Sequence, residues 1–241
     1  MEDLEMVDRS LLKRILSVPN STPTAALYLE TGCIRIRTVL KARRVNYLHY
    51  LVKLKRTEML SKFFYCQWYD NKPHDWTTQV KVDLEELNLP NDLNNIEKKT
   101  TISWKNLVKR KIREYELKQL IHIKDTQNQS KLSSLNYVEL KQQDYFTSLN
   151  VPQAKEIFLF RTRMANFSGN FKEGGHVKPC PLCGQHEDTQ ILSFNCPKVV
   201  HKIEIVDEYE DIFKAKITHN LANTLTQIMK LRKLQMNNLV Q

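Results

Sequence analysis

Two features constrain the fold of this chain most: glycine is scarce, and apolar residues recur with helical spacing. Only 5 of the 241 residues are Gly. Apolar side chains three or four positions apart mark one face of a helix. The pattern is clear near both ends of the chain, in Leu4, Val7, Leu11 and Ile15 and again in Ile217, Leu221, Leu225 and Ile228. The sequence therefore predicts an all-α protein built as an irregular array of helices.

Proline, glycine and polar runs predict where the helices begin and end. Thr22-Pro23 opens a short helix and Gly32 ends it, because Pro suits a first turn and Gly a C-terminal cap. The polar run 125–134 predicts a loop, and Gly174-Gly175 a break. Further helices are expected at about 34–54, 57–69, 83–87, 92–98, 103–123, 137–148, 153–164 and 212–236. We expect four regions: basic helices at 1–69, further helices at 70–165, a cysteine segment at 166–201 and a C-terminal helix at 202–241.

The charge balance of the chain favours a polyanionic partner and argues against a membrane. Lys and Arg number 37 against 27 Asp and Glu, a formal net charge of +10. No apolar run approaches the ~20 residues that span a bilayer. The first five residues, Met1 to Glu5, are acidic and unlike a signal peptide. We expect an intracellular protein, in the nucleus or the cytoplasm, that uses no small-molecule substrate.

Two of the expected helices carry basic residues on one face. Residues 34–56 contain no acid. Like charges at helical spacing repel one another, and a phosphate backbone laid along them would reverse that effect and release counterions. The alternative is an ordinary solvated face. The candidate nucleic-acid contacts are Arg37, Lys41, Arg43 and Arg44 in the first helix and Lys105, Lys109 and Arg113 in the second.

A short cysteine run predicts a metal site. Two residues separate Cys180 from Cys183, with Pro and Gly beside them, and twelve residues separate Cys183 from Cys196. This spacing is typical of a tetrahedral zinc knuckle that holds one ion. With five cysteines in the chain, an odd number, a reducing compartment and metal binding are favoured over disulfides. The alternative is a set of free thiols that binds no metal.

The fourth ligand of that site is open at the level of the sequence. His201 lies five positions after Cys196 and ranks first, followed by His186 and His176. Four protein ligands would make the site closed and structural rather than hydrolytic. Such a site could contribute on the order of 10 kcal/mol of apparent folding free energy to a segment with little core of its own.

Several separated motifs resemble one family in order and spacing. Together they look like the region just after the polymerase core in reverse transcriptases of non-LTR (LINE-type) retrotransposons. The resemblance covers about residues 3 to 200. The motifs are Leu27-Tyr28-Leu29-Glu30-Thr31-Gly32, Ile36-Arg37, Ala42-Arg43-Arg44, Tyr47-Leu48-His49, Gln142-Gln143-Asp144-Tyr145, Phe160-Arg161-Thr162-Arg163-Met164, Asn170-Phe171-Lys172, Cys180-Pro181-Leu182-Cys183-Gly184, Glu187-Asp188-Thr189-Gln190 and Cys196-Pro197.

The resemblance implies a function in nucleic-acid binding. In that family these segments form thumb-like helices and a C-terminal zinc knuckle that help the polymerase hold RNA and target DNA. It implies thumb-like helices at 1–69 and zinc as the cofactor. One departure is Leu192, which stands where the family has a histidine ligand. The other is the missing catalytic palm, because no Tyr-x-Asp-Asp run occurs.

The expected function is therefore that of an accessory, non-catalytic region of an RNA-directed DNA polymerase, a detached piece that starts at an internal methionine. Its partners would be RNA or DNA and the missing palm domain. Two alternatives remain open. The chain can be a helical protein-interaction module, or a retroelement relic without function. Trp68, Trp76 and Trp104 can stack on bases, but their helical spacing beside apolar neighbours favours the core.

Overall fold

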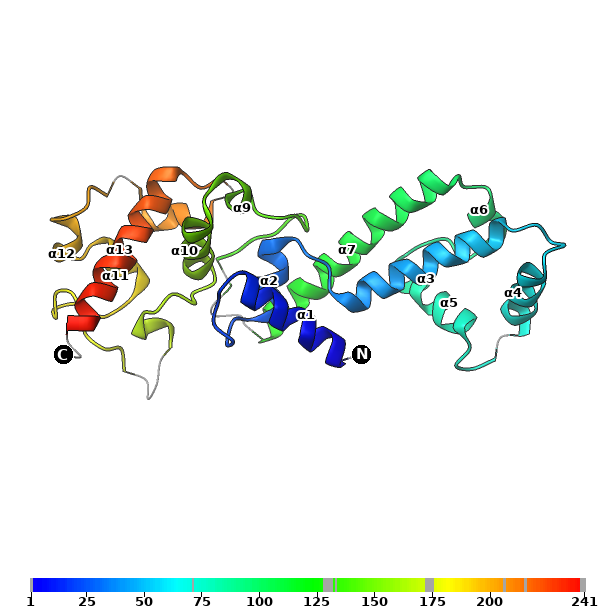
Figure 1. Ribbon diagram of the computed structural model, residues 1–241, viewed down its shortest axis with the longest axis horizontal. Helices are drawn as coiled ribbons and strands as arrows, with labels where there is room; N and C mark the ends of the chain where they lie inside the picture. The colour runs from blue at the N-terminus through cyan, green and yellow to red at the C-terminus, as the bar shows by residue number, and fades with distance from the viewer. Residues whose placement is uncertain are drawn as a thin grey trace. The chain divides into compact units, whose positions relative to one another are not determined.

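The computed structural model describes residues 2–70, 72–127, 132, 134–171, 176–205, 207–214 and 216–238 (Figure 1). Most of these residues are helical, and the β pairing among them is an isolated antiparallel bridge between Pro179 and Glu187. The prediction of an all-α fold is confirmed. The Gly174-Gly175 break, and residues 128–131 and 133 of the loop predicted at 125–134, lie outside the described residues. Residues 125–127 of that predicted loop are helical instead.

The chain divides into two compact units that do not follow the four expected regions. Unit 1 comprises residues 1–8 and 34–121, and unit 2 comprises residues 9–33 and 122–241. The early segment 9–33 belongs with the second half of the chain because Glu30 lies buried among side chains that come 107 to 131 positions later. Contacts between residues so far apart in the sequence cannot be predicted from local composition.

Unit 1 is built around a long central helix. Helix α3 (Ile36–Lys53) packs against α4 (Met59–Asp70), α5 (Trp76–Glu86) and the short α6 (Leu93–Glu97). The unit also contains the first residues of α1 (Glu2–Ile15) and most of α7 (Thr101–Gln127). Its apolar core includes Val45, Leu48, Val80, Leu84, Ile96, Trp104 and Val108.

Trp104 joins α7 to α3 in that core. Its indole Nε1 donates to the carbonyl oxygen of Val45 at 3.3 Å, and its ring stacks on that of His49 with centroids 5.4 Å apart. Trp68 is also buried, and Trp76 is half-buried. The expectation that tryptophans belong to the core is therefore confirmed for Trp68 and Trp104.

A buried ion pair fixes the start of α3 against α7. Glu116 is fully buried, and its carboxylate accepts from the Arg35 guanidinium at 2.5 and 3.3 Å. The same carboxylate accepts from the Thr38 hydroxyl at 2.5 Å. A charge removed from water in this way must keep its partner, because an uncompensated buried charge is strongly destabilising.

Unit 2 is a second helical cluster and contains more of the chain than unit 1. Helix α10 (Val151–Arg161) packs along α13 (His219–Asn238), with α9 (Tyr145–Ser148) and the 3-10 helix η2 (Tyr209–Phe213) against it. The remaining elements are α2 (Thr24–Thr31), η1 (Ser168–Asn170), α11 (Gln190–Phe194) and α12 (Pro197–Val200). Asn150 and Gln153 form a capping box at the start of α10.

Helix α2 ends where the sequence predicts, at Gly32. This residue has a left-handed backbone with φ +65°, and a Cβ placed there would lie 2.2 Å from the amide nitrogen of Gln142. Glycine is therefore required both by conformation and by space.

Two predicted helices are shorter in the structure. In the range 137–148 the helix is α9 alone, because the segment before it extends so that Tyr137 and Tyr145 reach the Glu30 carboxylate at 2.5 and 2.8 Å. The helix expected at 212–236 is α13 and begins at His219. Its predicted apolar residues Leu221, Leu225 and Ile228 are buried. The apolar stripe of α1 is different: Leu4, Val7, Leu11 and Ile15 are each more than half exposed.

None of the described helices combines the length and the apolar composition needed to cross a bilayer.

Replacing Glu116 with Gln is expected to destabilise unit 1. The substitution keeps the shape of the side chain but leaves the buried Arg35 guanidinium without its counter-charge, so the free energy of unfolding should fall by about 3 kcal/mol or more. Chemical denaturation followed by circular dichroism measures this. The matched control is Glu114→Gln, an exposed acid of the same helix that pairs with Lys111. Equal effects of the two substitutions would contradict the structural role of the buried pair.

Candidate metal centre and basic surface

The first two cysteines of the predicted site lie in a tight hairpin. The Cys180 amide donates to the His186 carbonyl at 2.6 Å, and the Asp188 amide donates to the Lys178 carbonyl at 2.8 Å. Inside this hairpin the Gly184 amide closes a turn on the Cys180 carbonyl at 2.8 Å. Gly184 has φ +69°, a conformation that glycine adopts without strain. The turn leaves Cys180 and Cys183 side by side.

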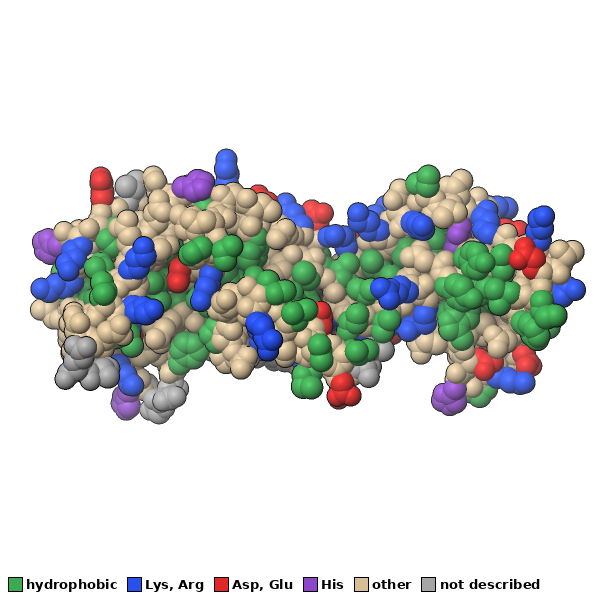
Figure 2. Space-filling view, in the orientation of Figure 1, with side chains coloured by type: hydrophobic (Ala, Val, Ile, Leu, Met, Phe, Trp, Pro, Cys, Tyr) green, Lys and Arg blue, Asp and Glu red, His purple; other side chains and the backbone are tan. Residues whose placement is uncertain are grey.

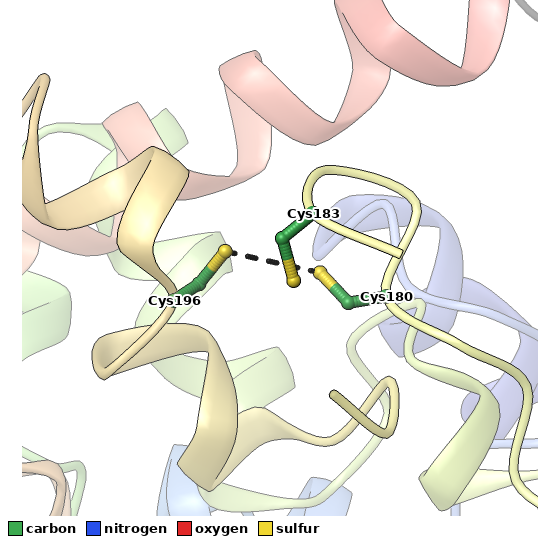
Figure 3. Close-up of side chains that lie close together, drawn as sticks. All are labelled: Cys180, Cys183 and Cys196. Carbon is green, nitrogen blue, oxygen red and sulfur yellow. Dashed lines mark hydrogen bonds between the residues drawn. The ribbon is translucent and has the colours of Figure 1, made fainter. Parts of the chain in front are cut away.

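The third cysteine comes from a helix start on the opposite side. Cys196 occupies the N-cap of α12, directly after α11. Figure 3 shows the three side chains pointing toward one another. Their sulfur atoms all lie within 4.8 Å of one another, and the Cys180 and Cys196 sulfurs are 4.0 Å apart. Two thiolates on one tetrahedral zinc ion, each at about 2.3 Å, stand about 3.8 Å apart. The cluster can hold a metal ion with little rearrangement.

The three thiols differ in their electrostatic surroundings. Burial raises the pKa of Cys196 to about 11, and the neighbouring Cys180 adds to the rise. For Cys183 burial acts in the same direction, but hydrogen bonds from the backbone N–H groups of Gln185 and His186 and from the Cys196 and Cys180 thiols together lower the pKa. Three clustered thiolates repel one another, and a bound cation removes that penalty.

None of the three candidate histidines joins the cluster in the part of the chain that the structure describes. His201 caps the C-terminal end of α12 and is exposed. It lies five positions after Cys196, which is about 140° around a helix, so the two side chains leave α12 in different directions. His186 and His176 are also exposed. Leu192 is half-buried on α11 and offers no ligand atom.

Sequence reasoning missed the residue that fixes this segment to α13 within unit 2. Arg232 of α13 donates to both carboxylate oxygens of Asp188 at 2.5 and 3.1 Å, and to the Asn166 carbonyl at 2.8 Å. Its guanidinium also lies 4.0 Å from the centre of the Phe167 ring. Asp188 in turn accepts from the Ser168 amide at 2.9 Å. The cysteine segment and the C-terminal helix, expected as separate regions, are therefore one packed structure.

Three basic residues of α3 are engaged within the protein. Arg37 pairs with Glu5, and Lys41 with Glu86 and, at 3.4 Å, with Asp83. Arg44 binds Asp83 through two hydrogen bonds of 2.5 and 3.0 Å. The prediction that these residues contact phosphates depends on their shared face and on the absence of acids in 34–56. The acidic partners of these residues come from α1 and α5.

Three of the four remaining basic candidates face solvent. Arg43, Lys105 and Lys109 are exposed, and no ion pair to them occurs among the described residues. Lys105 and Lys109 lie one turn apart on α7, while Arg113 is half-buried on the same helix. Figure 2 shows Lys and Arg side chains distributed over the visible face of unit 1. The structure thus separates cations that stabilise the fold from cations that can meet a partner.

No protein-family model, curated protein or solved structure matches this chain.

The cysteine cluster predicts a specific pattern of metal loss. Cys180→Ser should abolish metal binding, because it removes one of the three sulfur ligands of the cluster. His201→Ala should leave the metal in place, because His201 lies outside the cluster. Elemental analysis of the dialysed proteins measures both. Cys66→Ser, at an exposed cysteine of unit 1, is the control for a general loss of thiols. Metal loss in His201→Ala would show that His201 is the fourth ligand, as the sequence ranking has it.

Proposed function

We propose that this chain binds nucleic acid as a non-catalytic accessory region of a non-LTR retrotransposon reverse transcriptase. RNA or DNA is the partner, and the absent polymerase palm is a second one. The chain supplies binding surface, and the polymerase carboxylates would come from the palm. The support is the sequence resemblance together with the distribution of charge on the folded chain.

The observation that carries the proposal is the exposed basic face of α7. Lys105 and Lys109 project from one side of this helix with no acidic partner among the described residues. Counterions must gather at such a face, and a phosphate backbone displaces them with a gain in entropy. The net charge of +10 adds a long-range attraction for polyanions.

We propose zinc as the ion held by the cysteine cluster. Thiolate ligands select zinc among the common divalent ions, and the sulfur separations suit tetrahedral coordination. The bound ion would fix the hairpin of Cys180 and Cys183 against α12. Its role in this proposal is structural, since it positions the segment that Arg232 ties to α13.

A second candidate function is a protein-interaction module. Leu11 and Ile15 of α1 are exposed apolar residues of unit 2. Ile15 also lines a cavity of about 150 Å³ with Phe146, Leu149 and Phe158, and Val151 at its edge is 80% exposed. A stable oligomer that shows no salt-dependent affinity for nucleic acid would favour this function over the first.

Neutralising the exposed lysines of α7 should weaken the salt dependence of binding. Each phosphate contact on duplex DNA contributes about 0.9 to the slope of log K against log salt concentration. The double variant Lys105→Gln/Lys109→Gln should therefore lower that slope by about 2. Fluorescence anisotropy of a labelled duplex, titrated at several salt concentrations, measures the slope.

The matched control is Lys230→Gln/Lys233→Gln on α13, which changes the net charge equally at exposed positions of unit 2. This control should keep the slope of the unmodified protein. The same slope for both double variants would count against α7 as the interface. A wild-type protein without salt-dependent binding would overturn the proposed function itself.

A further inference from the structure

The outer face of α3 carries an exposed aromatic pair that the core does not use. Arg43, Tyr47 and Tyr50 follow one another at i, i+4 and i+7, so they share one side of the helix. Tyr47 is 45% exposed and Tyr50 is 52% exposed. The inner side of α3 holds the buried core residues and the arginines that pair with acids. The outer side is therefore a separate surface within unit 1.

The two tyrosine rings are arranged as a platform. Their centroids are 5.8 Å apart and their planes differ by 22°, which is a stacked arrangement. Trp76 of α5 meets the Tyr47 ring edge-on, with centroids 5.6 Å apart and an interplanar angle of 79°. An edge-to-face contact of this kind fixes the orientation of a ring. The platform is thus ordered before any ligand arrives.

Positive charge surrounds this platform along α3. Arg43 lies one turn before Tyr47, and Lys53 lies three positions after Tyr50. Both are exposed, and neither has an ion-pair partner among the described residues. The helix itself carries no acid. Figure 2 shows hydrophobic side chains gathered over the part of unit 1 that contains α3 to α5, with Lys and Arg around them.

We propose that this face binds single-stranded nucleic acid, with bases stacked on Tyr47 and Tyr50 and phosphates held by Arg43 and Lys53. The proposal rests on the proposed function and names a site within it. Aromatic side chains interleaved with cations are the usual means of holding unpaired bases, because every base has a π face and every nucleotide a charge. A duplex keeps its bases stacked inside, so it can use the cations but not the rings.

The test compares three ligands of equal length by fluorescence anisotropy: single-stranded (dT)12, a 12-nucleotide strand of abasic sites, and a 12-base-pair duplex. The abasic strand keeps the phosphates and lacks the bases. The protein should bind (dT)12 about ten-fold or more tightly than the abasic strand. Equal affinity for these two strands would overturn the proposal.

Variants then assign the effect to the rings. The single variant Tyr50→Ala should reduce the preference for (dT)12 over the abasic strand. The double variant Tyr47→Ala/Tyr50→Ala should remove it. Tyr47→Phe/Tyr50→Phe should keep it, because the rings remain. The control is Tyr69→Ala, an exposed tyrosine of α4 that lies beside Asp70 and stacks on Tyr65. A preference retained in Tyr50→Ala and in the double alanine variant would contradict the platform.

A folding check of the variants and a cross-linking experiment complete the test. Because Tyr47 contacts Trp76, the double alanine variant is checked by thermal unfolding, and Tyr50→Ala stands alone if the double variant is unstable. A strand carrying 5-iodouracil should cross-link to Tyr47 or Tyr50 on irradiation, as mapped by mass spectrometry. Cross-links confined to other residues would count against the site. Salt-dependent duplex binding without any preference for (dT)12 would leave the proposed function standing and remove this inference alone.

Discussion

Arginine side chains that bind buried carboxylates stabilise each of the two units from within. A carboxylate without water must keep a cation beside it, so each pair fixes which elements meet and in what register. The paired residues are separated by 39 to 131 positions in the sequence. Four such pairs are Arg35 with Glu116, Arg44 with Asp83, Arg161 with Glu30, and Arg232 with Asp188. Unit 1 contains the first two and unit 2 the others.

These pairs change which basic residues of α3 can be assigned to a partner. A run of cations without acids nearby in the sequence is typical of a phosphate-binding surface. On α3, however, much of that charge is paired with acids of other helices. Arg44 meets Asp83 of α5, and Arg37 meets Glu5 of α1. What remains free on α3 is its outer side, where Arg43 lies in line with two tyrosines. The basic composition of the chain thus serves stability and partner binding at different residues.

The sequence predicted what depends on local patterns. Helical periodicity and scarce glycine predicted the all-α fold, and cysteine spacing predicted the cluster of Cys180, Cys183 and Cys196. Gly32 as the end of α2 followed from its chemistry. The division into units could not be predicted, because it depends on contacts such as that of Glu30 with Arg161. The same holds for the Asp188–Arg232 pair. His201 ranks first as a ligand from its place five positions after Cys196, and in the structure it lies at the exposed C-terminal end of α12, outside the cysteine cluster.

The contact at Gly32 has an evolutionary consequence. A side chain at this position would collide with the backbone of residues 141 and 142, next to the Gln143 amide, which donates to the Glu30 carbonyl at 3.0 Å. Even a methyl group would thus push the chain away from the residue that Tyr145 and Arg161 surround. Substitutions at position 32 are therefore not neutral. Gly184 shares the left-handed backbone but has nothing within 4 Å of its missing Cβ. Asn or Asp can replace it at modest cost, so related chains can diverge at the knuckle turn while position 32 stays fixed.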